Sequence, residues 1–351
     1  MQKREDFAVL YFHEDKVGLA ICRLGSPSIL HIVARAETPF SGFLDGMLPN
    51  YEELAPIVQA LTNEVLRGIR IENLYVEAPD IFTRTAVVDL VKTLPGKKQV
   101  VKNVVDEVLG RGFDIPAGYT VINKSVLYWQ LDGGAPVADP VGHNAKEVLA
   151  KQSLTLCDEE FITLGQLSAT SAGFSQAVFV PGALSTLCYL VPQEERDSGV
   201  AVMNCDMFST TLVNVYGDGF LSQVTTPFGY AHIVGDLCIV MEIGPEEAAA
   251  KIAEANLSVD TSALSVDVIK SRIEEICQQL SEGGEVIGDK VLLTGDGIVQ
   301  VERVRDYLSR TFGMYVGATT CPQTGSNGGA EVKVRALCTF ISRRGIDNLL
   351  G

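Results

Sequence analysis

Three acidic side chains lie near turns that join predicted strands. Asp15 follows the first apolar run of the chain, and Asp206 and Asp218 flank another strand-like run at 211–216. Carboxylates are the hard oxygen ligands that divalent cations such as Mg²⁺ prefer. Metal-assisted phosphate chemistry is therefore one function to weigh against the rest of the sequence.

The cysteines give a weaker signal. They occur singly within apolar runs, without a Cys-x-x-Cys pair and without a histidine at ligand spacing. Cys205 lies at a predicted strand end, but no pattern links it to a histidine as nucleophile and base. Buried, reduced thiols are the better interpretation. The eight residues are Cys22, Cys157, Cys188, Cys205, Cys238, Cys277, Cys321 and Cys338.

Length and charge exclude several classes of protein. The 351 residues suggest about two domains, and 46% hydrophobic with 21% charged residues is typical of globular chains. The net charge of -16 opposes general binding to nucleic acid or anionic lipid. The sequence contains no stretch of roughly 20 apolar residues, and MQKRED is too polar to open a signal peptide. We expect a cytoplasmic protein with protein or small-molecule partners.

The first 80 residues predict three strands, a helix and a fourth strand. Strand-like runs lie at 7–12, 16–24 and 29–37, and apolar residues at helical spacing follow at 51–70 before a strand at 73–77. After residue 80 the pattern of strand-like and helix-like runs becomes irregular. It predicts a strand at 85–91, a helix at 100–109 and two strands near 118–132, which fits an inserted domain.

The pattern of the first segment returns after residue 198. Before it come a strand at 146–157, a helix at 159–173, a strand at 177–180, a helix at 183–190 and a polar turn at 192–198 that resembles a linker. Strands at 199–205, 211–216 and 220–226 precede helices at 229–242, 245–255 and 264–281, a strand at 291–293 and a helix from about 299. Two such halves predict an α/β chain with an internal duplication.

Several motifs in this order resemble the bacterial cell-division protein FtsA family of the actin-like ATPase superfamily. The strongest is Leu293-Thr294-Gly295-Asp296-Gly297, which looks like the adenosine motif of that family. The segment Asp139-Pro140-Val141-Gly142 favours FtsA over the related pilus-assembly protein PilM. The other segments are Asp132-Gly133, 194–200, 227–233 with Asp236, and 269–276.

The resemblance implies an actin-like, duplicated ribonuclease-H-like fold. One half (1A) would comprise residues 1–80 and 160–196, interrupted by an FtsA-type insertion (1C) at 81–159. The other half (2A) would comprise 197–231 and 289–351, with a small lobe (2B) at 232–288. Nucleotide would bind between the halves, where two glycine-rich hairpins approach the phosphates and an Asp in each organises metal and water.

Both hairpins depart from the family pattern. In the first, Tyr11 stands at the expected Asp and His13 at the expected Gly; in the second, Asn204 stands at the Asp. Asp206, Met207 and Phe208 replace the glycines of the second hairpin and add charge and bulk. We therefore expect a pseudo-ATPase without catalytic residues, metal or cofactor. The alternative is an active ATPase that binds ATP or ADP with magnesium through altered loops.

The adenosine side is better preserved. The resemblance places Glu247, Lys251, Gly295 and Gly297 beside the nucleoside, so weak adenosine binding is allowed. Each residue also has a structural explanation. Glu247 and Lys251 have the i, i+4 spacing of a surface ion pair on a helix, and the glycines fit a strand-to-helix turn.

The expected function is that of an FtsA-like scaffold in cell division. Family partners would be the tubulin-like protein FtsZ, other divisome components and copies of itself, with any membrane association at the division site made through partners. The small lobe is acidic and shortened, which weakens the case for FtsZ. A PilM-like platform for pilus or secretion assembly is a further alternative.

Partner contacts are expected on the lobes at 81–159 and 232–288. The single tryptophan, Trp129, and its neighbour Tyr128 are candidate anchors there, because aromatic side chains are enriched at binding hot spots. Trp129 fits the core of the insertion better, since a lone tryptophan is usually well buried.

Overall fold

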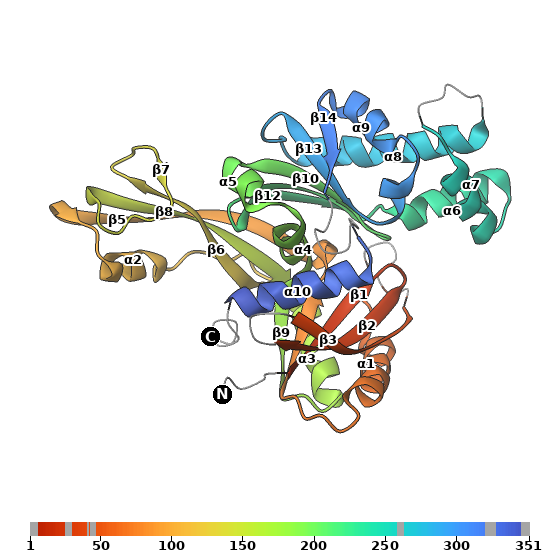
Figure 1. The fold of residues 1–351 in the computed structure, drawn as a ribbon, viewed down its shortest axis with the longest axis horizontal. Coiled ribbons are helices and arrows are strands. Elements are labelled where there is room, and N and C mark those ends of the chain that lie inside the picture. The colour runs from red at the N-terminus through yellow and green to blue at the C-terminus, as the bar shows by residue number, and fades with distance from the viewer. Residues whose placement is uncertain are drawn as a thin grey trace.

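The computed structural model describes residues 6–24, 30–40, 42, 47–257, 263–319 and 328–344. Its sheets are arranged in three groups (Figure 1). Two five-stranded sheets lie one above the other in this view, and a four-stranded sheet extends away from them.

The first sheet has the strand order β3-β2-β1-β4-β9. β1 (Asp6–His13), β2 (Lys16–Leu24) and β3 (Leu30–Pro39) form an antiparallel meander, and β4 (Asn73–Ala78) pairs in parallel with β1 and with β9 (Gln176–Pro181). α1 (Tyr51–Leu66) and α3 (Glu159–Ser171) pack against each other and against this sheet. The helix predicted to Arg70 ends earlier, because Arg67 adopts a left-handed conformation at φ 40°.

The second sheet repeats this order as β12-β11-β10-β13-β14, which confirms the predicted duplication. Its strands are β10 (Val200–Cys205), β11 (Thr210–Tyr216), β12 (Gly219–Thr226), β13 (Lys290–Gly295) and β14 (Tyr315–Ala318). A separate core joins it to α6 (Tyr230–Met241), α7 (Pro245–Glu254), α8 (Leu264–Gly283) and α9 (Val304–Phe312). The helix expected from about 299 is instead a short 3₁₀ turn, η3 (Gly297–Gln300), followed by α9.

The third sheet has the order β5-β8-β6-β7 and lies within the predicted insertion. It comprises β5 (Thr83–Gln99), β6 (Tyr119–Leu131), β7 (Pro136–Val137) and β8 (Asn144–Asp158), with α2 (Lys102–Leu109) against it. β5 follows a 3₁₀ turn, η2 (Asp80–Phe82). The two strands predicted near 118–132 are a single strand, β6, which bends through two register shifts against β8.

Trp129 belongs to the core of this sheet and is 5% exposed, so it is not a surface anchor. Tyr128 is partly buried and lies edge-on to Tyr216 of β11, with ring centroids 5.8 Å apart. Its role is therefore to pack the insertion against the second sheet.

Two helices connect the five-stranded sheets. α4 (Gly182–Leu190) follows β9, and α10 (Ala330–Arg344) follows β14, so the two occupy equivalent places in the duplication. They pack on each other and share one apolar core with strands of both sheets. α10 also contacts β1, although the sequence analysis assigned 289–351 to the second half.

The segment at 192–198, expected to be a linker, is the helix α5 (Gln193–Ser198). Its Arg196 is 2% exposed, and the guanidinium donates to the carbonyl oxygens of Cys188, Val191 and Gly217 and to Asp218. The side chain thereby joins α4, α5 and the β11–β12 turn. No helix in the part of the chain that the structure describes is long and apolar enough to cross a membrane.

Candidate functional site

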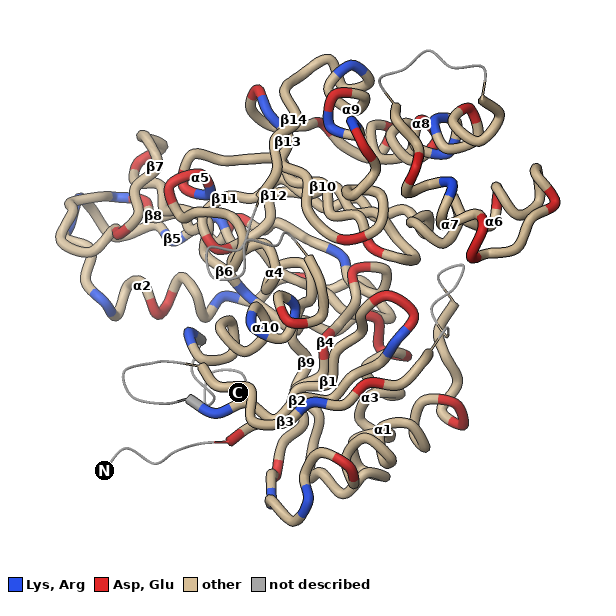
Figure 2. Tube along the Cα trace, turned by 45° about the vertical axis from the view of Figure 1, so that its right-hand side comes forward, with Lys and Arg blue, Asp and Glu red and all other residues tan. Residues whose placement is uncertain are grey.

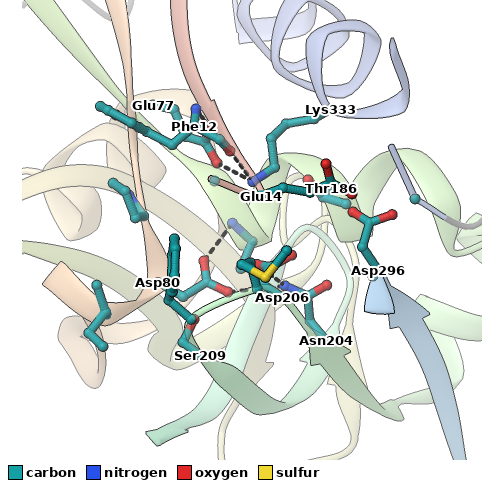
Figure 3. A pocket seen from close by; sticks show the side chains of 18 of the residues that line it. Phe12, Glu14, Glu77, Asp80, Thr186, Asn204, Asp206, Ser209, Asp296 and Lys333 are labelled. Atoms are coloured by element: carbon teal, nitrogen blue, oxygen red, sulfur yellow. Dashed lines mark hydrogen bonds and ion pairs between the residues drawn. The ribbon is translucent and has the colours of Figure 1, made fainter. Parts of the chain in front are cut away.

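A cleft of about 790 Å³, including solvent at its mouth, lies where the two five-stranded sheets meet (Figure 3). It is built from the ends of β1, β4, β10 and β13 and from the first turns of α4 and α10. Its polar lining consists of Glu14, Glu77, Asp80, Thr186, Asn204, Asp206, Ser209, Asp296 and Lys333. This is where the resemblance places a nucleotide.

The duplication puts one aspartate after the central parallel strand of each sheet. Asp80 follows β4 and accepts a hydrogen bond from the N–H of Ala183 in the first turn of α4, at 3.0 Å. Asp296 follows β13 and accepts from the N–H of Gly329, just before α10, at 3.3 Å. Carboxylates stabilise helix N-termini because N–H groups there lack intrahelical partners. Both aspartates therefore have a structural role.

A buried ion pair closes one side of the cleft. Nζ of Lys333, on α10, lies 3.1 Å from Oε1 of Glu77 at the end of β4 and donates to the carbonyl oxygen of Phe12 at 2.6 Å. Oε2 of Glu77 accepts from the N–H of Phe12 at 2.8 Å. The side chains of Lys333 and Glu77 are only 17% and 3% exposed. The pair thus ties α10 to β1 and β4, as the dashed lines in Figure 3 show.

Neighbouring carboxylates keep Lys333 protonated. Burial opposes the ammonium form, but Glu77, Asp206 and Asp80 outweigh it and raise the pKa of Lys333. Burial raises the pKa of Glu77, although Lys333 and the Phe12 N–H act against that rise.

Asn204 separates two carboxylates on the opposite side of the cleft. Its Nδ2 donates to Oδ2 of Asp206 at 3.0 Å and to Oδ2 of Asp80 at 3.3 Å. Burial, followed by the charge of Asp206, raises the pKa of Asp80 to about 7. An aspartate at position 204 would add a third carboxylate and further repulsion, and the neutral Asn204 avoids both.

His13 is not among the residues that line the cleft, but its Nδ1 lies 3.5 Å from Oδ2 of Asp296, which is. Burial, followed by repulsion from Lys333, Lys16 and Arg35, lowers the pKa of His13 to about 3. Burial, followed by the charge of Asp206, raises the pKa of Asp296 to about 6. At neutral pH the histidine is therefore uncharged.

The first hairpin does not present Tyr11 to the cleft. Tyr11 is fully buried in the core shared by the two sheets, and its hydroxyl donates to Oε1 of Glu37 at 2.7 Å. The ring lies across Gly18 on β2, where a Cβ would come within 2.3 Å of it. Tyr11 is thus a packing residue.

The second hairpin does present its substituted side chains. Met207 and Phe208 both line the cleft, as the sequence predicted. The hairpin is fixed to the start of α6, because the carbonyl oxygens of Asp206 and Met207 accept from the N–H groups of Tyr230 and Ala231 at 3.2 and 2.9 Å. At Gly229 a Cβ would lie 2.4 Å from the Asp206 carbonyl oxygen, so only glycine allows this approach.

The four predicted adenosine-side residues occupy different surroundings. Gly295 lines the cleft, and a Cβ there would lie 2.2 Å from the carbonyl oxygen of Cys205. Gly297 packs against Tyr230, with a Cβ approach of 2.6 Å. Glu247 and Lys251 form an ion pair of 3.8 Å on α7, with the Glu247 side chain 59% exposed. Close packing and surface pairing explain these positions, and adenosine binding stays a prediction.

No set of three or more potential metal ligands comes together among the described residues. Of the carboxylates considered first, Asp206 lines the cleft, Asp218 pairs with Arg196, and Asp15 is not among the lining residues. Cys205 is fully buried, and burial raises its pKa well above the usual range, which disfavours a thiolate nucleophile.

Lys333, Glu77 and Asp80 were not among the site residues predicted from the sequence. A glutamate at the end of an apolar strand and an aspartate after Pro79 were visible signals, but their partners lie far along the chain. Lys333 lies on α10, which was not predicted.

No protein-family model and no curated protein matches this sequence. Solved structures do match. The PilM-PilN type IV pilus biogenesis complex contains a chain with 16% identity and a TM-score of 0.64, over 98% of this chain and 99% of that one. MreB5 of Spiroplasma citri bound to ADP has 9% identity and a TM-score of 0.57, over 98% of this chain and 99% of that one. Ethanolamine utilization protein EutJ from Carboxydothermus hydrogenoformans has 14% identity and a TM-score of 0.50, over 95% of this chain and 90% of that one.

These proteins share the fold of the actin-like ATPases. This chain has an actin-like fold. At such low identities the likeness extends to the fold alone, and membership of the FtsA family stays a prediction. In the actin-like fold of this chain, the cleft lies between the two duplicated halves and contains the Lys333–Glu77 pair.

Proposed function

We propose that the protein is an actin-fold scaffold that binds partner proteins and does not hydrolyse ATP. The observation that carries the proposal is the charge balance of the cleft. Glu14, Glu77, Asp80, Asp206 and Asp296 face one lysine among the lining residues that the structure describes, and that lysine already binds Glu77. A triphosphate in this site would meet uncompensated negative charge.

The second hairpin adds a steric argument. Phosphate-binding hairpins let backbone N–H groups approach the ligand, which is why glycine suits them. Here Met207 and Phe208 project into the cleft, and Asn204 stands where the family has a metal-organising aspartate. The residues present therefore fit Mg-ATP poorly. No step of hydrolysis is assigned to them.

Among assembly roles, we favour a platform of the PilM type. The segment at 139–142 favoured FtsA, yet local geometry explains it: Oδ1 of Asp139 accepts from the N–H of Val141 at 2.9 Å, and Gly142 has φ +89°. Such an Asx turn has its own physical cause and discriminates poorly between families. The match to the chain from the PilM-PilN complex over 98% of this sequence supports a protein partner. FtsA-like division scaffolding, with FtsZ or other divisome proteins, is the second candidate.

The two peripheral lobes offer surfaces for such contacts. Val101, Ile115 and Val141 are exposed in the insertion, and Ile239, Val240 and Leu264 are exposed in the lobe of α6, α7 and α8. Ile239 is 79% exposed, and acidic residues gather at the α6–α7 end of that lobe (Figure 2). Exposed apolar side chains with a charged rim are typical of protein interaction sites.

Two measurements test the proposal. Isothermal titration and phosphate-release assays with Mg-ATP, at protein concentrations that permit self-assembly, should show neither magnesium-dependent binding nor turnover. Micromolar Mg-ATP affinity, or turnover lost in Asp206→Asn, would establish the active-ATPase alternative. Co-purification from the native cell followed by mass spectrometry should recover a pilus or secretion component, whereas recovery of FtsZ would favour the division role.

A further inference from the structure

Two cysteines far apart in the sequence meet in the central core. Cys22 lies on β2 and Cys338 on α10, and their Sγ atoms are 2.7 Å apart. Both side chains are fully buried, in the core shared by the two five-stranded sheets. A disulfide requires sulfurs at about 2.05 Å, so a shift of less than about 1 Å would join them.

We propose that Cys22 and Cys338 are an oxidative modification site, which closes into a disulfide between β2 and α10. The other three buried cysteines, Cys157, Cys205 and Cys277, have no sulfur–sulfur contact at such a distance among the interactions described, although Cys277 lies near enough to Cys205 to contribute to its raised pKa. The juxtaposition is therefore particular to this pair. The proposed disulfide does not depend on the proposed scaffold function.

A peroxide supplies the oxidant. One thiol, as thiolate, attacks a peroxide oxygen, breaks the O–O bond and becomes a sulfenic acid, with release of water after proton transfer. The second sulfur then attacks the sulfenic sulfur and displaces its hydroxyl group, which leaves as a second water. In sum, two thiols and one hydrogen peroxide give one disulfide and two waters, so sulfur is oxidised and peroxide is reduced.

Burial controls the rate of this reaction. Burial, followed by the hydrogen bond to Cys22, raises the pKa of Cys338 well above its usual range, so the thiolate is scarce in the closed core. Oxidation therefore proceeds through brief opening of α10 from β2, and a reductant acts through the same opening. The modification is slow compared with that of an exposed thiol.

The disulfide would fix the helix that carries Lys333. α10 packs on α4 and β1, and Lys333 reaches from it to Glu77 in the cleft. Joining α10 covalently to β2 removes the motion that separates Lys333 from Glu77. Because the bond spans 316 residues of chain, it also restricts the unfolded state strongly.

The test treats the purified full chain with hydrogen peroxide under native conditions and digests it without reduction. We expect a linked peptide containing Cys22 and Cys338, lighter than the two reduced peptides by the mass of two hydrogen atoms. The oxidised chain should unfold at a temperature higher by about 5 °C or more, and dithiothreitol should reverse the shift.

Cys22→Ala and Cys338→Ala should each abolish the linked peptide and the reversible shift, and both remove only a small side chain from the core. Cys157→Ala is the matched control, because Cys157 is equally buried but should leave both signals unchanged. The proposal is overturned if Cys22 and Cys338 still remain reduced after prolonged peroxide treatment, long after oxidation of the partly exposed Cys188 and Cys238 is complete. Formation of the link only in urea would overturn it equally.

Discussion

Lys333 is the residue on which the organisation of the cleft depends most. It neutralises Glu77, lies among the carboxylates that raise its own pKa, and donates to the backbone of β1. An ammonium free to face phosphate would favour nucleotide binding, whereas here Lys333 is engaged by Glu77 and Phe12. The same contacts give it a measurable effect on stability.

Lys333→Met should lower the free energy of unfolding by about 3 kcal/mol, because Glu77 then stays buried without its cation. Adding Glu77→Gln should recover much of the loss, since the amide oxygen can still accept from Phe12 without a buried charge. Urea unfolding at neutral pH measures both. The control is Lys251→Met, whose exposed ion pair should contribute about 0.5 kcal/mol or less. Equal small effects at both lysines would contradict this assignment.

The carboxyl of Asp80 predicts a pH dependence. Its pKa is about 7 in the folded chain and near 3.8 when unfolded, so the folded state binds the proton more tightly. The stabilisation from that proton is complete below about pH 4 and is lost as the pH rises through 7.

Asp80→Asn can still accept from Ala183 and loses only the longer, 3.3 Å bond from Asn204. It should therefore exceed the wild type in stability at pH 8, by on the order of 2 kcal/mol, and by much less at pH 4.5. Denaturant unfolding at the two pH values measures the difference. Asp296→Asn should show a smaller effect in the same direction, and the exposed Asp306→Asn should show none. A variant less stable than the wild type at pH 8 would refute the assignment.

At the scale of elements, α5 shows how one side chain can hold a short helix in place. Six residues are too few to form a stable helix alone, so α5 depends on tertiary contacts. Arg196 supplies them through its planar guanidinium, which reaches three carbonyl groups and Asp218.

Arg196→Lys should therefore destabilise the protein by about 3 kcal/mol, since one ammonium cannot satisfy the same acceptors in the same geometry. Arg303→Lys, at an exposed ion pair, is the control and should have almost no effect. Thermal unfolding of both variants measures the difference in stability. Full stability of Arg196→Lys would show that α5 is held by something else.

Local pattern predicted most elements but not their partners. The duplication followed from repeated β-rich runs, and the insertion followed from the irregular pattern between them. Met207 and Phe208 were placed correctly because a hairpin turn is a local feature. α10 was missed, although Val334, Leu337, Cys338 and Ile341 have helical spacing. Tyr11 was assigned to the cleft because alignment gives no information on which face of a strand a side chain occupies.

The ion pair and the Asp80–Asn204 contact could not be predicted from one sequence. Each joins residues from opposite halves of the chain, and neither charge pattern nor periodicity specifies such a contact. The turn at 192–198 was misassigned for a different reason. Pro192 followed by Glu194 and Glu195 is a helix-start signal, but the segment is short and strongly polar.

At the scale of the molecule, the scaffold proposal predicts that partner binding depends on the lobes rather than on the cleft. The test uses one double variant in each lobe: Ile239→Asp with Val240→Lys, and Val101→Asp with Val141→Lys. At least one of them should reduce partner capture in pull-downs at least tenfold, because central apolar contacts dominate interfaces. Both changes are at exposed positions and should leave the unfolding temperature unchanged.

Phe208→Ala in the cleft is the matched control and should leave partner capture intact. Localisation of a fluorescent fusion provides the second readout. If capture survives changes in both lobes but fails in Phe208→Ala, the cleft is the functional site and the scaffold interpretation is wrong.

The position of α10 late in the chain also affects how the protein is made. The core that holds Phe7 and Val9 of β1 is completed by Leu337 and Ile341, so β1 leaves the ribosome long before the helix that covers it. During translation the inner face of the first sheet stays uncovered while the insertion, a self-contained sheet with its own core, can already form. Folding should therefore be slow, and a chaperone that shields apolar strands should associate with the nascent chain until α10 emerges.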